Sequence, residues 1–367
     1  MGRGVARSRW SFVLGVALVA EACSSGVPAP TPATSAAGTP GPAPSVVAER
    51  SDAPSASATA TESALPVVTA GEPWIAFEQF LRRAEVVLVR PDGTDLHSPA
   101  RDLQGGHETN PDWSPDGSRL VFAMTEGDHD NLWVIDADGT GARRLATCDG
   151  ACEVLDDPAW SPDGHSVLYD RNRTTNGVTT STLETVDVAS GAIRILSTAA
   201  PNHFYAGQRW SPDEKHVVLE VVELAGASDQ SDIVDVSLAI IELAKPTPGG
   251  RGLTKRGTFP ETAAWAPDGS WIAFGARSGP GVDADDLYEI RPDGSGLRKI
   301  TDLGRQGGNA THPDIAADGR SIVFAAVLPG SGSRTVLGLV DRSGGDVKPA
   351  TGSTWIDGVH PRWRPTP

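Results

Sequence analysis

Apolar and polar residues follow one repeating pattern from Pro73 to the end of the chain. A turn rich in Ser, Pro, Asp and Gly is followed by a short apolar segment, such as Leu120-Val121-Phe122 or Ile272-Ala273-Phe274. A loop, a second apolar segment and an Asp-Gly turn come next, and a more polar segment such as Arg143-Arg144-Leu145-Ala146 closes the unit. Short apolar runs separated by turn residues predict β-strands rather than helices.

The turn before each apolar segment has nearly the same sequence, and this sets the period. The motif Trp113-Ser114-Pro115-Asp116-Gly117 recurs at Trp160, Trp210 and Trp265, then weakly at Ile315, and a last tryptophan stands at Trp363. The intervals are 47, 50, 55, 50 and 48 residues. Proline at the second and glycine at the fourth position suit a type I turn. A strand-rich period near fifty predicts the four-stranded blades of a propeller.

The two ends of the repeat region complete each other. Trp74-Ile75-Ala76-Phe77 opens with a second-strand sequence and lacks the strand that should precede it, whereas the strand ending at Trp363 stops where its turn should begin. Pairing the two leaves no unpaired inner edge. The sequence therefore predicts an all-β, six-bladed β-propeller over residues 73–367. Each blade has four antiparallel strands, and the C-terminal strand closes the ring against the N-terminal blade.

These motifs resemble the TolB-like (WD40-like) repeat of periplasmic six-bladed propellers. The resemblance rests on Trp-Ser-Pro-Asp-Gly, the apolar strand after it, the Asp-Gly turn and the basic fourth strand, and it covers about 80% of the chain. It implies the fold far more specifically than the function. The family's best-known member carries a separate N-terminal domain, which low-complexity sequence replaces here, so a role in the Tol complex is not implied.

The N-terminus has the pattern of an export signal. Arginines precede an apolar run from Trp10 to Ala20, which is too short to span about 30 Å of hydrocarbon. Cys23 follows a small residue, as in the lipobox of bacterial lipoproteins, although Ala20 and Glu21 depart from the usual residues there. We expect a signal peptide over residues 1–22 and a lipid on Cys23, with plain secretion after nearby cleavage as the alternative. Residues 23–72, rich in Ala, Pro, Ser and Thr, should form an extended tether.

Composition narrows the partners and the chemistry. The 47 acidic and 31 basic residues give a net charge of −16, which argues against nucleic acid as a partner. No Gly-x-Ser-x-Gly elbow, Walker sequence or dinucleotide-binding glycine pattern occurs. Cys148 and Cys152 should form a small disulfide in an exported protein, with a metal or redox dithiol as the alternative. The motif tryptophans should pack between neighbouring blades.

Six residues, each three positions before a motif residue, are the candidate binding site. They are Asn110, Asp157, Gly207, Thr262, His312 and His360. The repeat should bring them together where each chain segment enters an innermost strand, in an exposed rim at the mouth of the central channel. Ligand recognition by the polar members is the hypothesis. Simple hydration of the strand entrance is the plainer alternative, and a divalent metal on the two histidines and a carboxylate is a third.

Connectivity also predicts which face of the propeller binds. First-to-second and third-to-fourth turns should share one face, and second-to-third loops and blade-to-blade links the other. The second set is long and acidic, with clusters at Asp128, His129 and Asp130, at Asp229 and Asp232, and at Asp283, Asp285 and Asp286. Loops on a rigid scaffold commonly carry binding sites. Solvated acidic loops without a ligand are the simpler interpretation, and Ca²⁺ is the alternative.

These observations favour a non-catalytic binding or scaffold module of the bacterial cell envelope. It should be a monomer that faces the periplasm or the cell exterior, touches the membrane only through the lipid on Cys23, and recognises a protein or glycan partner. No cofactor is expected, apart from the Ca²⁺ or other divalent metal considered at the channel mouth. The alternative is a metal-dependent lyase or hydrolase working at that mouth.

Overall fold

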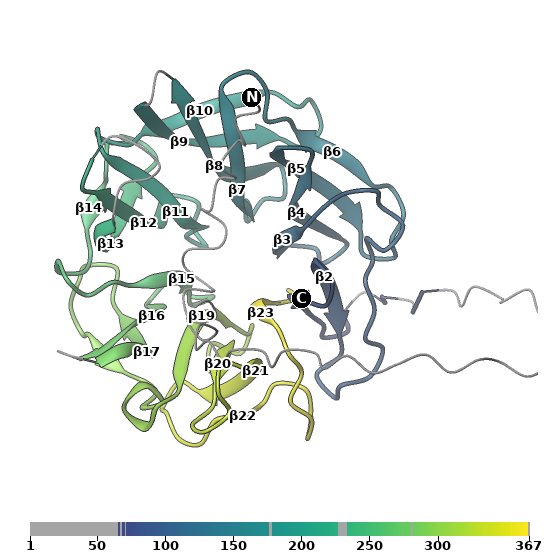
Figure 1. Cartoon of the computed structure of the whole chain (residues 1–367), viewed down its shortest axis with the longest axis vertical. Coiled ribbons are helices and arrows are strands. Elements are labelled where there is room, and N and C mark those ends of the chain that lie inside the picture. The colour runs from purple at the N-terminus through teal and green to yellow at the C-terminus, as the bar shows by residue number, and fades with distance from the viewer. Residues whose placement is uncertain are drawn as a thin grey trace, which may run out of the picture. The chain divides into compact units, whose positions relative to one another are not determined.

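The computed structural model describes residues 65–66, 68–69, 71–175, 178–226, 233–279 and 282–365. Within this part of the chain, six antiparallel sheets stand in a ring (Figure 1). Five sheets have four strands in chain order, so the chain forms the six-bladed propeller that the repeat predicts. The elements outside the sheets are loops and one short 3-10 helix, η1 (Gly304–Gln306).

The strands run from the ring centre outwards in each blade. Blade 1 consists of β3 (Glu108–Trp113), β4 (Arg119–Glu126), β5 (His129–Asp136) and β6 (Arg143–Ala146). Blade 2 consists of β7 (Cys152–Trp160), β8 (Ser166–Thr175), β9 (Val178–Asp187) and β10 (Ile193–Thr198). Blade 3 consists of β11 (His203–Trp210), β12 (His216–Leu224), β13 (Ile233–Glu242) and β14 (Arg251–Gly252).

The second half of the ring has the same arrangement. Blade 4 consists of β15 (Glu261–Trp265), β16 (Ile272–Gly279), β17 (Val282–Ile290) and β18 (Arg298–Lys299). Blade 5 consists of β19 (Asn309–Ile315), β20 (Ser321–Val327), β21 (Thr335–Asp341) and β22 (Lys348–Pro349). Blade 6 consists of β23 (Val359–Trp363), β1 (Ile75–Phe80) and β2 (Ala84–Val89), and a single bridge between Leu88 and His97 takes the place of its fourth strand.

Blade 6 joins the two ends of the described chain. The last strand, β23, lies beside β1 with Ile75 opposite Trp363 and Ala76 opposite Arg362. Figure 1 shows β23, in yellow, next to the dark blue start of the propeller. Arg364 extends this contact by donating from Nε to the Gly117 carbonyl at 2.8 Å. The predicted closure of the ring is therefore confirmed.

The repeated turn has the geometry that its residues dictate. In blade 1 the Gly117 amide donates to the Ser114 carbonyl at 2.7 Å, and the Ser114 hydroxyl donates to Asp116 at 2.6 Å. Glycine is favoured at this position because its φ is +64°. In blade 3 the same position is Glu214, which adopts φ +59° without being glycine.

The hydrophobic core lies between blades rather than inside each blade. Six of the seven buried apolar clusters combine residues of two neighbouring blades; Val121 and Leu132 of blade 1, for example, pack with Tyr169 of blade 2. The motif tryptophans lie at these boundaries. The indole N–H of Trp113 donates to the Arg362 carbonyl at 3.3 Å, and Trp210 and Trp265 make the equivalent bond to the preceding blade. Their predicted packing between blades is confirmed.

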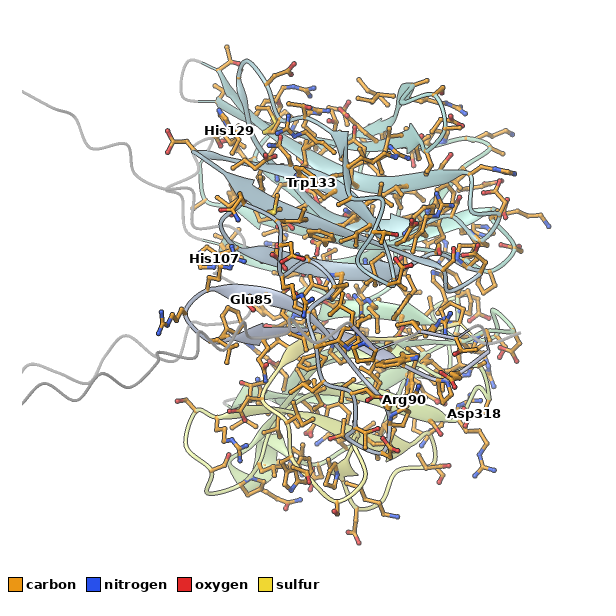
Figure 2. The ribbon with its side chains drawn as sticks, turned by 90° about the vertical axis from the view of Figure 1, so that its right-hand side faces the viewer. Glu85, Arg90, His107, His129, Trp133 and Asp318 are labelled. Carbon is orange, nitrogen blue, oxygen red and sulfur yellow. A yellow bond between two sulfur atoms is a disulfide. The ribbon has the colours of Figure 1, made fainter. Side chains whose placement is uncertain are left out.

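The two faces of the propeller differ in their connections. Figure 2, a side view, shows Glu85, His107 and His129 on one side and Arg90 and Asp318 on the opposite side. Glu85 and His129 follow second-to-third loops and His107 lies on a blade-to-blade link, so this side is the face predicted to bind. We call it the mouth face. In the described part of the chain, no helix is long and apolar enough to cross a membrane.

The folded part begins before Pro73. Val68 packs against the cluster between blades 6 and 1, and Glu72 forms an ion pair with Arg90 at 2.9 Å. Arg364 also donates to the Thr69 carbonyl at 2.5 Å. The last residues assigned to the tether thus contact the propeller, whereas the signal peptide, Cys23 and the rest of the tether lie outside the described residues.

Candidate functional site

A β-bulge interrupts every innermost strand at the predicted site position. The residues and their φ values are Asn110 (51°), Asp157 (49°), Gly207 (60°), Thr262 (33°), His312 (53°) and His360 (49°). The pairing register shifts at the same place in all six sheets. Left-handed backbone is uncommon for residues other than glycine, and bulges are frequent beside functional sites. The six positions are therefore equivalent in structure as well as in sequence.

Two details differ from the sequence-based expectation. All six residues lie at the bulges, and three of them, Asp157, Gly207 and His312, lie well inside the innermost strands, whereas Thr262 and His360 are the second residues of β15 and β23. They are also not an exposed rim: His312 is only 3% exposed, Asn110 and Thr262 are buried, and Asp157 and His360 are partly buried. The bulge turns these side chains inwards, which a count of residues along the strand does not reveal.

Carboxylates hold the strained backbone at three bulges. The amide of Asn110 donates to Glu78 at 2.6 Å, that of Thr262 to Glu220 at 2.5 Å, and that of Gly207 to Asp157 at 2.8 Å. A bulge deprives an amide of its ladder partner, and a buried amide needs an acceptor. Each of these carboxylates comes from the preceding blade, so the bonds also join blades.

Three of the buried carboxylates of this region that were not predicted, Glu78, Asp170 and Glu220, share one position in the repeat. Each follows the apolar triplet of a second strand, as in Phe77-Glu78 and Tyr169-Asp170. All three are almost completely buried. An acidic residue at the end of an apolar triplet was the signal that could have found them, because an ionised side chain is rarely buried without a partner.

The side of the ring formed by blades 5 and 6 holds the two histidines. The imidazoles of His312 and His360 meet edge to face, with ring centroids 4.0 Å apart. Burial, followed by repulsion from His360 and Arg209, holds the pKa of His312 well below its usual range. Burial alone would lower the pKa of His360, but the Glu78 carboxylate, 2.5 Å from its Nδ1, outweighs this and raises the pKa.

The opposite side, formed by blades 2 and 3, is acidic. Asp156 accepts a hydrogen bond from the side-chain amide of Asn110, with Nδ2 at 2.8 Å, and Asp170 accepts one from Gln208 Nε2 at 3.0 Å. Burial and then the neighbouring charges of Asp157 and Asp130 raise the pKa of Asp156 to about 7. Burial is also the main cause that raises the pKa of Glu220 to about 8, and that of Asp170 well above its ordinary value.

A second pair of buried carboxylates, Asp112 and Asp314, lies one residue before the motif residue of blades 1 and 5. Asp112 accepts from the Trp160 amide at 2.8 Å, and Asp314 accepts from the Trp363 amide at 2.7 Å. Burial raises the pKa of Asp112 to about 6 and that of Asp314 to about 7, although Arg209 opposes both shifts. These carboxylates connect neighbouring blades, which is a structural role.

Two oxygen atoms of the acidic side have no hydrogen-bond partner among the described residues. They are Oε1 of Gln208, whose residue is 0% exposed, and Oε2 of Glu220, whose residue is 2% exposed. The Nε2 atom of the same Gln208 amide contacts Asp170 and the Asp157 carbonyl, at 3.0 and 2.9 Å. The unpaired Oε1 therefore lies within this group of carboxylates. Buried acceptors of this kind usually have a partner.

The acidic loops are less uniform than predicted. Asp128 is exposed in a loop of the mouth face, but Asp130 belongs to β5, and Asp285 and Asp286 belong to β17. Asp286 is buried and forms an ion pair with Lys299 at 2.7 Å. Its carboxylate is thus part of the blade and not a solvated loop. Asp229 and Asp232 lie outside the described residues, as does the side chain of Asp283.

Four of the eight exposed large apolar side chains of the described residues lie at or beside loop tips of the mouth face. Phe80 and Leu81, 45% and 68% exposed, form the tip between β1 and β2. Val178 and Val234 are exposed at the starts of β9 and β13, next to the equivalent loops of blades 2 and 3. Adjacent exposed apolar residues such as Phe80 and Leu81 are a feature of interaction surfaces.

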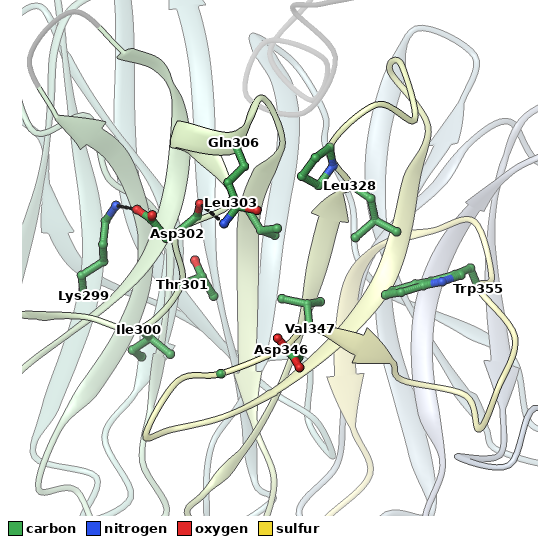
Figure 3. Close-up of a pocket in the computed structure, with 12 residues that line it drawn as sticks. Lys299, Ile300, Thr301, Asp302, Leu303, Gln306, Leu328, Asp346, Val347 and Trp355 are labelled. Carbon is green, nitrogen blue, oxygen red and sulfur yellow. Dashed lines mark hydrogen bonds and ion pairs between the residues drawn. The ribbon is translucent and has the colours of Figure 1, made fainter.

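A cleft of about 680 Å³ lies at the outer side of the ring between blades 4 and 5. Figure 3 shows Lys299, Asp302 and Gln306 on one of its sides and Trp355 on the other. Lys299 is paired with Asp302 at 2.7 Å. This cleft shares no residue with the ring centre.

The structure joins Cys148 and Cys152 by a disulfide, and both residues are buried between blades 1 and 2. This is the pairing expected for an exported chain. A search of the described residues finds no group of three or more His, Cys, Asp or Glu side chains arranged to hold a metal ion.

The geometry defines a closed six-bladed propeller with a buried polar cluster at its centre. A family model described as the TolB beta propeller domain matches residues 65–239. Together with the repeated turn motif, this match supports similarity to the TolB-like propeller repeat over about half of the chain.

Individual proteins agree with this assignment over limited lengths. The Tol-Pal system protein TolB of Anaeromyxobacter dehalogenans is 52% identical over 48 residues, which are 13% of this chain and 10% of that protein. The uncharacterized peptidase YuxL of Bacillus subtilis is 25% identical over 184 residues, half of this chain and 24% of that protein. The chain therefore spans between a tenth and a quarter of these relatives.

A solved structure supports the same fold. The crystal structure of TolB from Acinetobacter baumannii superposes with a TM-score of 0.56 and 18% identity, over 79% of this chain and 66% of that one. At this identity the likeness concerns the fold alone.

Proposed function

We propose that this protein is a binding module of the bacterial cell envelope that recognises a protein partner through the mouth face. The main support for this proposal is that exposed apolar loop tips share this face with the irregular loops, while the polar bulge residues lie at its centre. Apolar anchors next to buried polar groups resemble the core of a protein interface. The opposite face consists mainly of tight turns, which offer few side chains to a partner.

The similarity to the TolB-like propeller and to the Tol-Pal system protein TolB supports a place in the envelope. Export through the signal peptide and anchoring through a lipid on Cys23 belong to the same proposal. The extended tether would then hold the propeller away from the membrane surface.

The experiment compares two leucines of similar exposure on opposite faces. A photo-reactive amino acid replaces Leu81 on the mouth face or Leu297, 58% exposed on a turn of the other face, in the full-length protein expressed in its native host. We expect a protein adduct from position 81 and none from position 297. Equal adducts from both positions would contradict a binding face.

Two further outcomes would redirect the proposal. An adduct at position 81 that glycosidases remove and proteases leave intact would identify a glycan partner. A stoichiometric transition metal in the purified protein would favour the lyase or hydrolase alternative instead.

A further inference from the structure

The outermost strand of blade 2 is longer than those of the other four-stranded blades. β10 has six residues, whereas β6 has four and β14, β18 and β22 have two each. β10 is the last strand of its sheet, and Figure 1 shows it at the outer rim of the ring. Among the five four-stranded sheets of the described chain, blade 2 therefore has the longest outer edge.

The outward backbone groups of β10 lack partners among the described residues. In an antiparallel pair, every second residue points its N–H and C=O groups away from the paired strand. The backbone of β10 makes hydrogen bonds only within its pair with β9. Blade 6 differs, because the outward amides of its last strand, β2, donate to His107 Nδ1 at 3.0 Å, Glu108 Oε2 at 3.1 Å and the His97 carbonyl at 2.8 Å. An unpaired edge such as that of β10 is a template for a further strand.

Two exposed isoleucines lie on one face of β10. Ile193 is 49% exposed and Ile195 is 57% exposed, and their spacing of two residues places both side chains on the same face. Proteins commonly protect an outer edge with a short strand, a basic residue or a proline. β22 combines all three, since it consists of Lys348 and Pro349 alone. β10 is long, contains no proline and exposes apolar side chains, which is typical of an interaction surface.

Arg194 stands between the two isoleucines and points to the opposite face of the strand. Its side chain is exposed and has no ion-pair partner within the described part of the chain. Arginines of other fourth strands are paired. Arg144 of β6 lies 2.6 Å from Glu126, and Arg298 of β18 lies 3.0 Å from Glu289. Arg194 is therefore a cation on an open edge that can pair with an acidic residue of a partner.

We propose that the outer edge of blade 2 binds an extended segment of a partner protein, which adds a fifth strand beside β10. Apolar residues of the segment lie opposite Ile193 and Ile195, and an acidic residue between them lies opposite Arg194. The main-chain hydrogen bonds supply affinity, and the alternating side chains supply specificity. A second copy of this chain fits less well, because two molecules of net charge −16 repel each other and β10 itself has no acidic residue for Arg194. This second surface lies outside the mouth face and goes beyond the function proposed above.

The probe is a fluorescently labelled peptide, Thr-Val-Glu-Val-Thr, with an amidated C-terminus. Fluorescence anisotropy measures its binding to the full-length protein, and Thr-Val-Lys-Val-Thr is the control peptide. We expect saturable binding of the glutamate peptide with a Kd of about 0.1–1 mM, as suits a ligand of this size, and much weaker binding of the lysine peptide. Hydrogen exchange should show that the peptide protects amides of β10 and leaves those of β6 unchanged.

N-methylation tests the backbone ladder without any protein variant. Two versions of the glutamate peptide carry N-methyl groups along one edge each, so that each version lacks the N–H donors of that edge. The version that is blocked on the edge facing β10 should lose binding, and the other should bind like the parent peptide. Full binding of both versions would show that no strand is added.

The matched variants are Ile195→Lys and Leu297→Lys. Leu297 has nearly the same exposure, 58%, but lies on a turn of blade 4. Ile195→Lys should weaken peptide binding about tenfold, because it removes an apolar contact and protects the edge, and Leu297→Lys should leave binding unchanged. Arg194→Glu should reverse the preference, so that the lysine peptide binds more tightly than the glutamate peptide.

Several results would overturn the inference. They are no binding of the glutamate peptide, equal binding of the two peptides to the wild-type protein, and equal weakening by Leu297→Lys. A wild-type dimer in sedimentation velocity that Ile195→Lys dissociates would assign the edge to a second copy instead. If Ile195→Lys does not fold, the N-methylated peptides decide with the wild-type protein. The crosslink at position 81 tests the mouth face separately and does not depend on this edge.

Discussion

Removing residues 359–367 should abolish cooperative folding, because these residues supply the innermost strand of blade 6. The deletion removes the β1–β23 ladder, the bond from Trp113 to the Arg362 carbonyl and the bonds from Arg364 to the Gly117 and Thr69 carbonyls. Each hydrogen bond contributes roughly 1 kcal/mol. The deletion also exposes the apolar cluster between blades 5 and 6, which includes Ile75 and Phe77. Burial of an aromatic side chain adds about 3 kcal/mol.

The expected loss is comparable with a whole stability of about 5–15 kcal/mol. Two buried carboxylates lose partners as well, since Glu78 contacts His360 and Asp314 accepts from the Trp363 amide. Urea unfolding followed by tryptophan fluorescence measures the effect, with deletion of residues 366 and 367 as the control. A synthetic peptide of residues 359–367 should restore a cooperative transition to the truncated protein. If the truncated protein melts within a few degrees of the intact one, the closure is not what holds the ring together.

Four further predictions concern the turn at Glu214, the two histidines, the pH dependence of stability, and Cys23. Glu214→Gly should raise stability by about 1 kcal/mol because φ there is +59°, and Gly164→Glu, at the equivalent turn of blade 2, should lower it by a similar amount in the same urea titration. Replacing both His312 and His360 with alanine should cost about 3 kcal/mol, because His312 is buried and Glu78 would lose its partner; an unchanged melting temperature would support the exposed rim expected from the sequence. Stability should fall as pH rises from 5 to 8. Burial raises the pKa of Glu220 to about 8 and that of Asp314 to about 7 in the folded protein, so the folded state binds protons that the unfolded state has lost. Glu220→Gln should remove the contribution of Glu220 to this slope, which is at most about 1.4 kcal/mol per pH unit. A Cys23→Ser variant that still carries radiolabelled fatty acid would contradict lipidation at that residue.

The fold was predictable because its signals repeat. Turn chemistry around Trp113, Trp160, Trp210 and Trp265 fixes where each first strand ends, and the missing strand before Trp74 indicates the closure. The same spacing aligned the six bulge positions. The bulges themselves could not be predicted, because asparagine, aspartate, threonine and histidine share no preference for left-handed backbone strong enough to mark them.

The environment of individual side chains was harder to predict from the sequence than the fold. Asp285 and Asp286 look like loop residues because apolar runs alone suggest a short strand, but β17 starts at Val282 and pairs them with Arg277 and Ala276. Glu78 and Glu220 were overlooked because their partners, His360 and Thr262, are distant in sequence and meet them only across a blade boundary.

The location of the core between blades has a consequence for how the protein is made. A single blade cannot bury its apolar surface alone, and the ring is complete only when β23 joins β1. β23 follows all the other described strands in the sequence, so the ring can close only after every one of them has been synthesised. Under the proposed export this delay would be useful, since an unfolded chain can still be threaded across a membrane. Transport would then have to be complete before β23 pairs with β1 and closes the ring.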